Sequence, residues 1–132
     1  MKSFKGLVAA VLAAFVIGGC APVVLVGVGA AAGVSGVKYY EGALTVNYHA
    51  SFDRTWNAVE KSMERHKVKV DLQQRELGSG KLSGQDFRGR PVTITVQYVA
   101  VEETKVVIRV GHLGDRDESM TYKEDIQKIL FP

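Results

Sequence analysis

Cysteine is almost absent from this chain of 132 residues, and the one that occurs is Cys20. A single cysteine excludes an internal disulfide and any paired-cysteine metal motif. The three histidines, His49, His66 and His112, have no metal-ligand spacing to one another or to Cys20. His49 and His112 fall at or just beyond the ends of expected strands, so they could approach in space. The sequence therefore predicts no metal site and no cofactor.

Charge is missing from residues 6–37, which are made almost wholly of Ala, Val, Gly, Leu and Ile. Such a run does not belong on the surface of a soluble domain. The formal net charge of +3 includes Lys2 and Lys5, and without them 15 basic residues face 14 acidic ones. The basicity of the whole chain is thus no argument for nucleic-acid binding.

Residues 1–19 have the three parts of a secretory signal peptide: a basic start, an apolar stretch and small residues before the cut. Ile17, Gly18, Gly19 and Cys20 resemble a bacterial lipobox, with Ile17 to Gly19 as the signal-peptidase recognition sequence. The resemblance implies that Cys20 receives a diacylglyceryl group and becomes the acylated amino terminus. Several acyl chains together give lasting attachment to membrane lipid.

The residue after the cysteine is Ala21 rather than an aspartate. In lipoproteins of Gram-negative bacteria, this resemblance implies delivery from the inner to the outer membrane. We therefore expect a lipid-anchored protein of the cell envelope, on the outer membrane and facing the periplasm.

Residues 20–42 follow as an apolar segment rich in glycine and alanine. Gly27, Gly29 and Ala32 spell a dinucleotide-binding fingerprint, but no second buried strand and no well-placed acidic residue follow them. Two readings remain: a flexible tether or membrane-associated helix, or a span in which Gly29 and Gly33 pack helices together at GxxxG spacing. Tyr39 and Tyr40 beside Lys38 suit a membrane interface, and packing of one tyrosine on the domain is the alternative.

Residues 43–132 carry the hydrophobic periods of a folded domain. Period two predicts strands at 44–48, from 68 onward, at 82–87, at 92–98 and at 106–110. One apolar stripe, Phe52, Trp56, Val59 and Met63, predicts a helix from Ser51 to near Lys67. A last helix begins at Asp115 or Asp117 and buries Tyr122, Ile126, Ile129 and Leu130.

The predicted fold is α+β, in the order β-α-β-β-β-β-α. Short connections make the five-stranded sheet mainly antiparallel, and both helices cover its apolar face. The other face is then polar and shows the following residues: Thr45, Asn47, Lys69, Asp71, Ser83, Thr93, Thr95 and Arg109.

The runs "YYEGALTVNYHASFDRTWNAVEKSMERHKVKV", "GKLSG", "RGRPVTITVQYV" and "TKVVIRVGHLGDRDES" resemble a family of small bacterial lipoproteins known only as a domain of unknown function. The resemblance covers nearly all of the chain. It supports the fold and the envelope location, and it transfers no catalytic residue.

No catalytic constellation is present in the sequence, and we expect a non-enzymatic binding or structural module. An envelope protein or a cell-wall component would bind to the polar sheet face, with Thr93, Thr95 and Arg109 as candidate contacts. Nucleic acid is not an expected partner, because Tyr48 and Tyr98 fall on the core side of their strands. The alternatives are a glycine-mediated oligomer in the membrane, and a carrier of lipid or a small apolar ligand between helices and sheet.

Overall fold

The computed structural model describes residues 33–132, which form one compact unit. The signal peptide, the lipobox residues Ile17 to Cys20, and Gly29 lie outside the described residues. Eight elements follow in order: β1 (Val34–Tyr40), β2 (Ala43–Tyr48), α2 (Phe52–Arg65), β3 (Lys69–Glu76), β4 (Ser79–Gln85), β5 (Pro91–Ala100), β6 (Glu103–Val110) and α3 (Arg116–Leu130). The α+β fold with two helices is confirmed.

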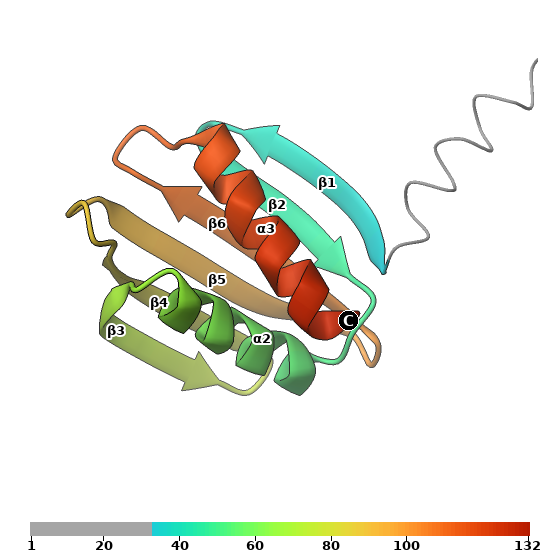
Figure 1. The fold of residues 1–132 in the computed structure, drawn as a ribbon. Helices are drawn as coiled ribbons and strands as arrows, with labels where there is room; N and C mark the ends of the chain where they lie inside the picture. The colour runs from blue at the N-terminus through green and yellow to red at the C-terminus, as the bar shows by residue number, and fades with distance from the viewer. Residues whose placement is uncertain (1–32) are drawn as a thin grey trace, which may run out of the picture. The chain divides into compact units, whose positions relative to one another are not determined.

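A single sheet runs in the order β1-β2-β6-β5-β4-β3, and every neighbouring pair is antiparallel. Strands β3 to β6 form the predicted meander, and β2 pairs with β6 at its far side. Both helices lie on the same face of the sheet: α3 packs on β2 and β6, and α2 packs on β5 (Figure 1). The opposite face is left uncovered by any described element.

The sheet has six strands, so the predicted count of five is wrong. The additional strand is β1, which lies within the apolar segment predicted for residues 20–42. It forms a hairpin with β2 through Glu41 and Gly42, which both have positive φ, at 49° and 81°. Two positive φ values define a type I′ turn, which is usually marked by Asn-Gly or Asp-Gly. Glu-Gly lacks that signature, and the hairpin is therefore hard to recognise in the sequence.

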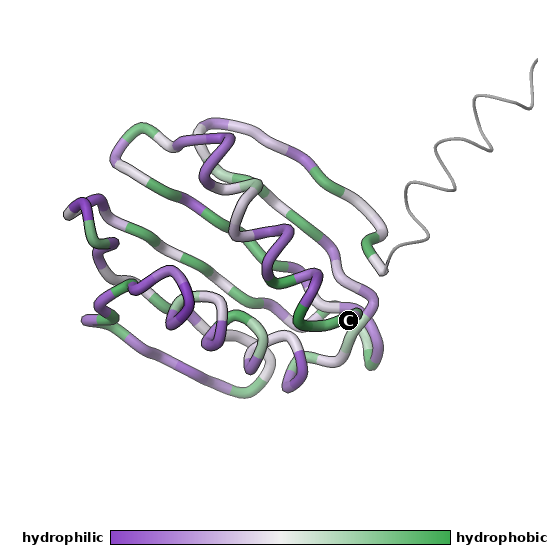
Figure 2. The backbone as a smooth tube through the Cα atoms, in the orientation of Figure 1, coloured by the Kyte–Doolittle hydropathy of each residue, from purple (hydrophilic) through white to green (hydrophobic). Residues whose placement is uncertain are grey.

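The core lies between the helices and the inward-facing residues of the four inner strands. The stripe on α2 is confirmed, because Trp56, Val59 and Met63 are buried and Phe52 stacks on Trp56 at 6.3 Å between ring centroids. The second helix buries Tyr122, Ile126 and Leu130 as expected, whereas Ile129 is only partly buried. Hydrophobic and hydrophilic positions alternate along the inner strands, whereas β3 is mostly hydrophilic (Figure 2).

The two helix starts agree with the sequence reading. Ser51 caps α2 by accepting a hydrogen bond from the backbone N–H of Arg54 at 3.4 Å. Asp115 caps α3 by accepting one from the N–H of Glu118 at 3.1 Å. These side chains satisfy backbone donors that the first helical turn leaves unpaired. The acidic cluster at 115–118 is thus explained as a helix start.

Strand β3 departs from simple alternation. The register shifts between Val70 and Leu72, so that Asp71 forms an irregularity and Leu72 lies opposite Ser83. A bulge inserts one residue and reverses which face the following side chains occupy. Leu72, which alternation from Val68 and Val70 would place in the core, therefore lies on the uncovered face at 37% exposure. Gln73 and Arg75 take the helix side instead, and Arg75 pairs with Asp53 of α2.

Candidate functional site

The uncovered face of the sheet is a grid of side chains fixed by the strand register. One row crosses five strands as Lys38, Thr45, Val107, Thr95 and Lys81, each residue directly opposite the next. Side chains that are opposite each other in an antiparallel pair lie on the same face. The row thus has two threonine hydroxyls and a valine at its centre, and a lysine at each end.

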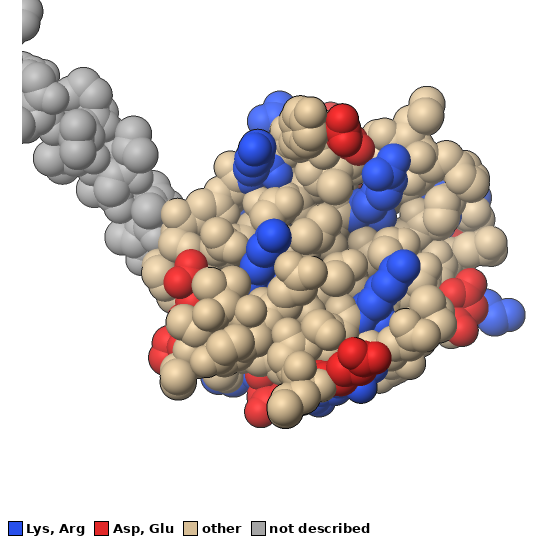
Figure 3. Space-filling view, turned by 180° about the vertical axis from the view of Figure 1, so that it is seen from behind, with Lys and Arg blue, Asp and Glu red and all other residues tan. Residues whose placement is uncertain are grey.

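Two further cations lie above and below that centre. Lys105 and Arg109 flank Val107 on β6 at two residues' distance, about 7 Å along the strand. Lys38 and Lys81 are each two strands away from Val107, or about 10 Å. We call this surface, defined by Lys38, Lys81, Lys105 and Arg109 around Val107, the basic face. Blue side chains surround a tan centre there, with acidic ones towards the margins (Figure 3).

None of these four cations forms an ion pair within residues 33–132. Arg109 donates only to the backbone carbonyls of Glu41, at 3.3 Å, and His112, at 3.2 Å. The Lys38 ammonium lies 5.5 Å from the ring centroid of Tyr40. Free positive charge on an uncovered surface is available to a negatively charged partner.

Elsewhere in the domain, four arginines pair with acidic residues, namely Arg65, Arg75, Arg88 and Arg90. The clearest case joins the β4–β5 turn to α3: Asp86 accepts hydrogen bonds at 2.9 Å from the backbone N–H groups of Arg88 and Arg90 and from Arg90 Nε. Burial alone would raise the pKa of the Asp86 carboxyl, but these donors and the guanidinium charge outweigh burial and lower it. Arg90 also reaches Asp115 and Glu118 at 3.7 and 3.5 Å. This network therefore has a structural role.

The three residues proposed from the sequence do lie together on the uncovered face. Thr93 is opposite Arg109, and Thr95 is opposite Val107. Thr93 also shares a hydrogen bond of 3.3 Å with Ser83. Sequence reasoning missed Lys38, Lys81 and Lys105. Alternation beside Leu82 and Val106 could have placed Lys81 and Lys105, whereas Lys38 required knowledge of β1.

Of the two hypotheses given for Tyr39 and Tyr40, packing on the domain applies to Tyr39, whereas Tyr40 is exposed. Tyr39 is half-buried and packs against the core, opposite Leu44. Tyr40 is 64% exposed and lies on the same face as Lys38. The pair thus contributes one residue to the domain and one amphipathic ring to the edge of the basic face.

Gly33 has a structural role of its own. Its φ of 83° is not helical, and a Cβ at this position would collide with the ring of Phe131 near the carboxyl terminus. Replacing Gly33 would therefore damage the domain whether or not helices pack through it. Gly29, its partner in the GxxxG spacing, is outside the described residues.

His49 and His112 do not lie close together. His49 follows the end of β2 that pairs with Thr104, and His112 follows the opposite end of β6. The suggested approach of these two rings is therefore wrong, because β2 and β6 are antiparallel. Among the described residues, no group of three His, Cys, Asp or Glu side chains could hold a metal ion.

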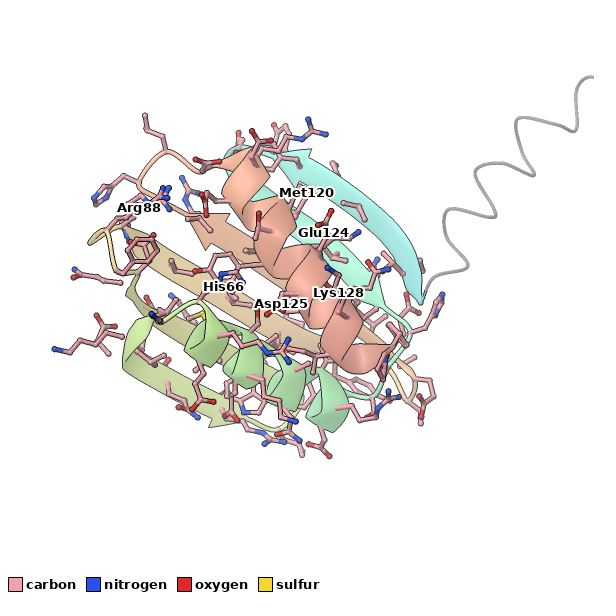
Figure 4. All side chains as sticks on the ribbon, in the orientation of Figure 1. His66, Arg88, Met120, Glu124, Asp125 and Lys128 are labelled. Carbon is pink, nitrogen blue, oxygen red and sulfur yellow. The ribbon has the colours of Figure 1, made fainter. Side chains whose placement is uncertain are left out.

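His66 is partly buried at the contact between the two helices. Its ring packs on Tyr122 at 4.2 Å between centroids, and Nε2 is 3.7 Å from Asp125 Oδ2 (Figure 4). Asp125 also accepts a hydrogen bond from Arg65 at 3.0 Å. Ser62 lies one turn before His66, but its hydroxyl is buried away from any substrate. This cluster joins α2 to α3 and offers no accessible nucleophile.

A groove of about 350 Å³ lies between α2 and the strands β3 and β4. Its apolar lining includes Met63, Val68 and Leu82. Glu60 and Glu64 of α2 also line the groove. The volume is at the lower end of the range for small-ligand sites. A carrier function would have to place an apolar ligand beside these two carboxylates.

Neither described helix is long and apolar enough to cross a membrane.

The fold and the site define a class: a small two-layer α+β domain whose antiparallel sheet has one face covered by helices and one basic face left open. Within that class, the chain belongs to the family described as "Protein of unknown function (DUF3568)", which matches residues 5–129. This confirms the family recognised as a domain of unknown function.

Among solved structures, the chain is similar to the solution structure of Chr148 from Cytophaga hutchinsonii. The two share 12% sequence identity, over 68% of this chain and 88% of that one, with a TM-score of 0.33. This likeness is too low to carry an argument about function. No curated protein sequence matches the chain.

Proposed function

We propose that this protein is a non-enzymatic envelope lipoprotein, held to the membrane by acylated Cys20, whose domain binds an envelope protein or cell-wall partner through its open sheet face. The anchor is supported by the lipobox and by the order of charges in the amino-terminal region. Basic Lys2 and Lys5 come first, residues 6–37 carry no charge, and basic Lys38 follows. The observation that carries the binding function is the set of four cations without ion pairs on the uncovered face, beside Thr93 and Thr95.

The anchor is tested by the mass of the mature amino terminus. Protein extracted from membranes should give an amino-terminal peptide that begins at Cys20 and carries acyl chains. The variant Cys20→Ser should keep residues 1–19 and lose the acyl mass, because only a thiol can take the lipid here. A wild-type chain that still begins at Met1 would refute the lipoprotein proposal.

The binding face is tested by crosslinking in intact envelopes. Wild-type protein should recover a defined partner, and the triple variant Thr93→Val, Thr95→Val, Arg109→Ala should lose at least about tenfold in recovery, as expected for about 1.4 kcal/mol of lost binding. Valine keeps the β-branched shape of threonine. The matched control on α3, Arg116→Ala with Thr121→Ala, should bind normally. Equal recovery with both variants would remove the sheet face from the proposal.

A carrier of a small apolar ligand is the second candidate, and the groove beside Met63 and Leu82 is the observation that favours it. The groove opens on the helix side, whereas the basic face is on the other side of the sheet. The triple variant therefore separates the two candidates, since it leaves the groove untouched.

A further inference from the structure

We propose that the basic face lies against the anionic phospholipid headgroups of the membrane that holds the anchor, so that α2 and α3 face away from the lipid. This rests on the proposed lipid anchor and not on the protein or cell-wall partner, because a face that lies against lipid headgroups is closed to such a partner. Three observations carry it: the charge of the face, the position of β1 and the length of chain before it.

The charge of the face is positive at its centre and mixed at its margins. Lys69 on β3 shares this face with the four defining cations, because it lies opposite Gln85. The carboxylates of the same face are at its margins: Glu76 is on the edge strand β3, and Glu103 is at the start of β6. Glu103 already accepts a hydrogen bond from Ser35. The centre of the face is therefore cationic.

The position of β1 brings the basic face near the bilayer. Twelve residues separate Cys20 from Gly33, and a chain of that length extends to at most about 45 Å. The first element after it is the edge strand that carries Lys38 and the exposed Tyr40. Tyrosine beside lysine is typical of membrane–water interfaces. Anchoring also makes docking intramolecular, so weak contacts suffice.

The expected strength follows from the number of cations. Each Lys or Arg near an anionic membrane surface favours binding by about fivefold. The four residues of the basic face together favour the docked orientation by up to several hundredfold at low ionic strength. High salt should release the domain while the acyl chains keep it on the membrane.

The test uses the full lipidated protein reconstituted on the outside of vesicles. One set contains phosphatidylglycerol and phosphatidylcholine in equal parts, and the other contains phosphatidylcholine alone. An amine-reactive reagent and mass spectrometry report how fast each lysine is modified. Lys38, Lys81 and Lys105 should react at least about fivefold more slowly on the anionic vesicles at low salt, and Lys61 and Lys128 on the helix side should react equally on both.

A pair of variants sharpens the experiment. Lys81→Gln with Lys105→Gln should weaken docking by about 25-fold, so that Lys38 on anionic vesicles reacts up to about 25-fold faster than in the wild type. The matched pair Lys61→Gln with Lys128→Gln removes the same charge from the helix side and should leave Lys38 protected.

Three results would overturn the inference. Lys38, Lys81 and Lys105 could react alike on both kinds of vesicle, or all lysines could be slowed equally by anionic lipid, or both variant pairs could expose Lys38 equally. If crosslinking nevertheless recovers a partner through Thr93, Thr95 and Arg109, the proposed binding function stands and only the membrane orientation fails.

Discussion

Replacing Gly80 with alanine should lower the free energy of unfolding by about 3 kcal/mol, the cost expected when a methyl group is forced into a packed core. Gly80 is buried on β4, on the side that faces α2, and a Cβ there would overlap the ring of Trp56. The φ of Gly80 is not positive, so the effect is steric and owes nothing to backbone strain.

The ring of Trp56 has no room to move aside. It is 1% exposed, Phe52 stacks beside it, and the Arg75 guanidinium lies 5.6 Å from its centroid. The matched control is Gly36→Ala on β1, where the nearest atom to a new Cβ is 3.8 Å away. Urea unfolding of both variants measures the difference. Equal midpoints would show that Trp56 adapts and that the packing argument is wrong.

The second large effect is expected for Asp86→Asn, which should cost about 2–3 kcal/mol at neutral pH. The substitution removes the negative charge that accepts from two backbone N–H groups and from the half-buried Arg90. Hydrogen bonds to a charged group contribute more than neutral ones, and an abandoned partner charge adds to the loss. Asp71→Asn, an exposed carboxyl with no ion pair among the described residues, is the control.

The cost of Asp86→Asn should depend on pH. Because the folded protein lowers the pKa of Asp86 below its ordinary value of 3.8, the carboxylate contributes its full stability above that value. The contribution falls as the pH drops through the folded pKa. Unfolding midpoints of wild type and Asp86→Asn should therefore converge in acid. A difference that stays constant down to the lowest pH would exclude the charge as its source.

The inner part of the fold is predictable because the hydrophobic residues of each element recur at one regular spacing. Residues such as Val92, Ile94 and Val96 alternate strictly, and α2 carries a single stripe around Trp56. The helix caps at Ser51 and Asp115 depend on side chains that hydrogen-bond their own neighbours, so they too are visible in the sequence. Each of these features is local.

The edges of the sheet were harder to predict, because their residues follow no single period. The hairpin turn at Glu41 and Gly42 lacks the usual residue pair, so the sequence of β1 is not distinguished from the apolar segment before it. The bulge at Asp71 shifts Leu72 to the uncovered face, which alternation alone does not anticipate. Lys38 joins the basic face only through β1. The sequence thus predicts a polar face, whereas the strand register shows that the face is basic.

The way the chain joins the sheet at Gly33 determines how the domain responds to mechanical load. Tension on the amino-terminal segment reaches β1 first, and β1 is an edge strand bonded only to β2. Pulled away from that edge, its hydrogen bonds would break one after another rather than together. The ring of Phe131 and the bond from His49 N–H to the Gly33 carbonyl, at 2.7 Å, brace the point where the force enters. The strand nearest the proposed anchor would thus yield before the meander that follows it.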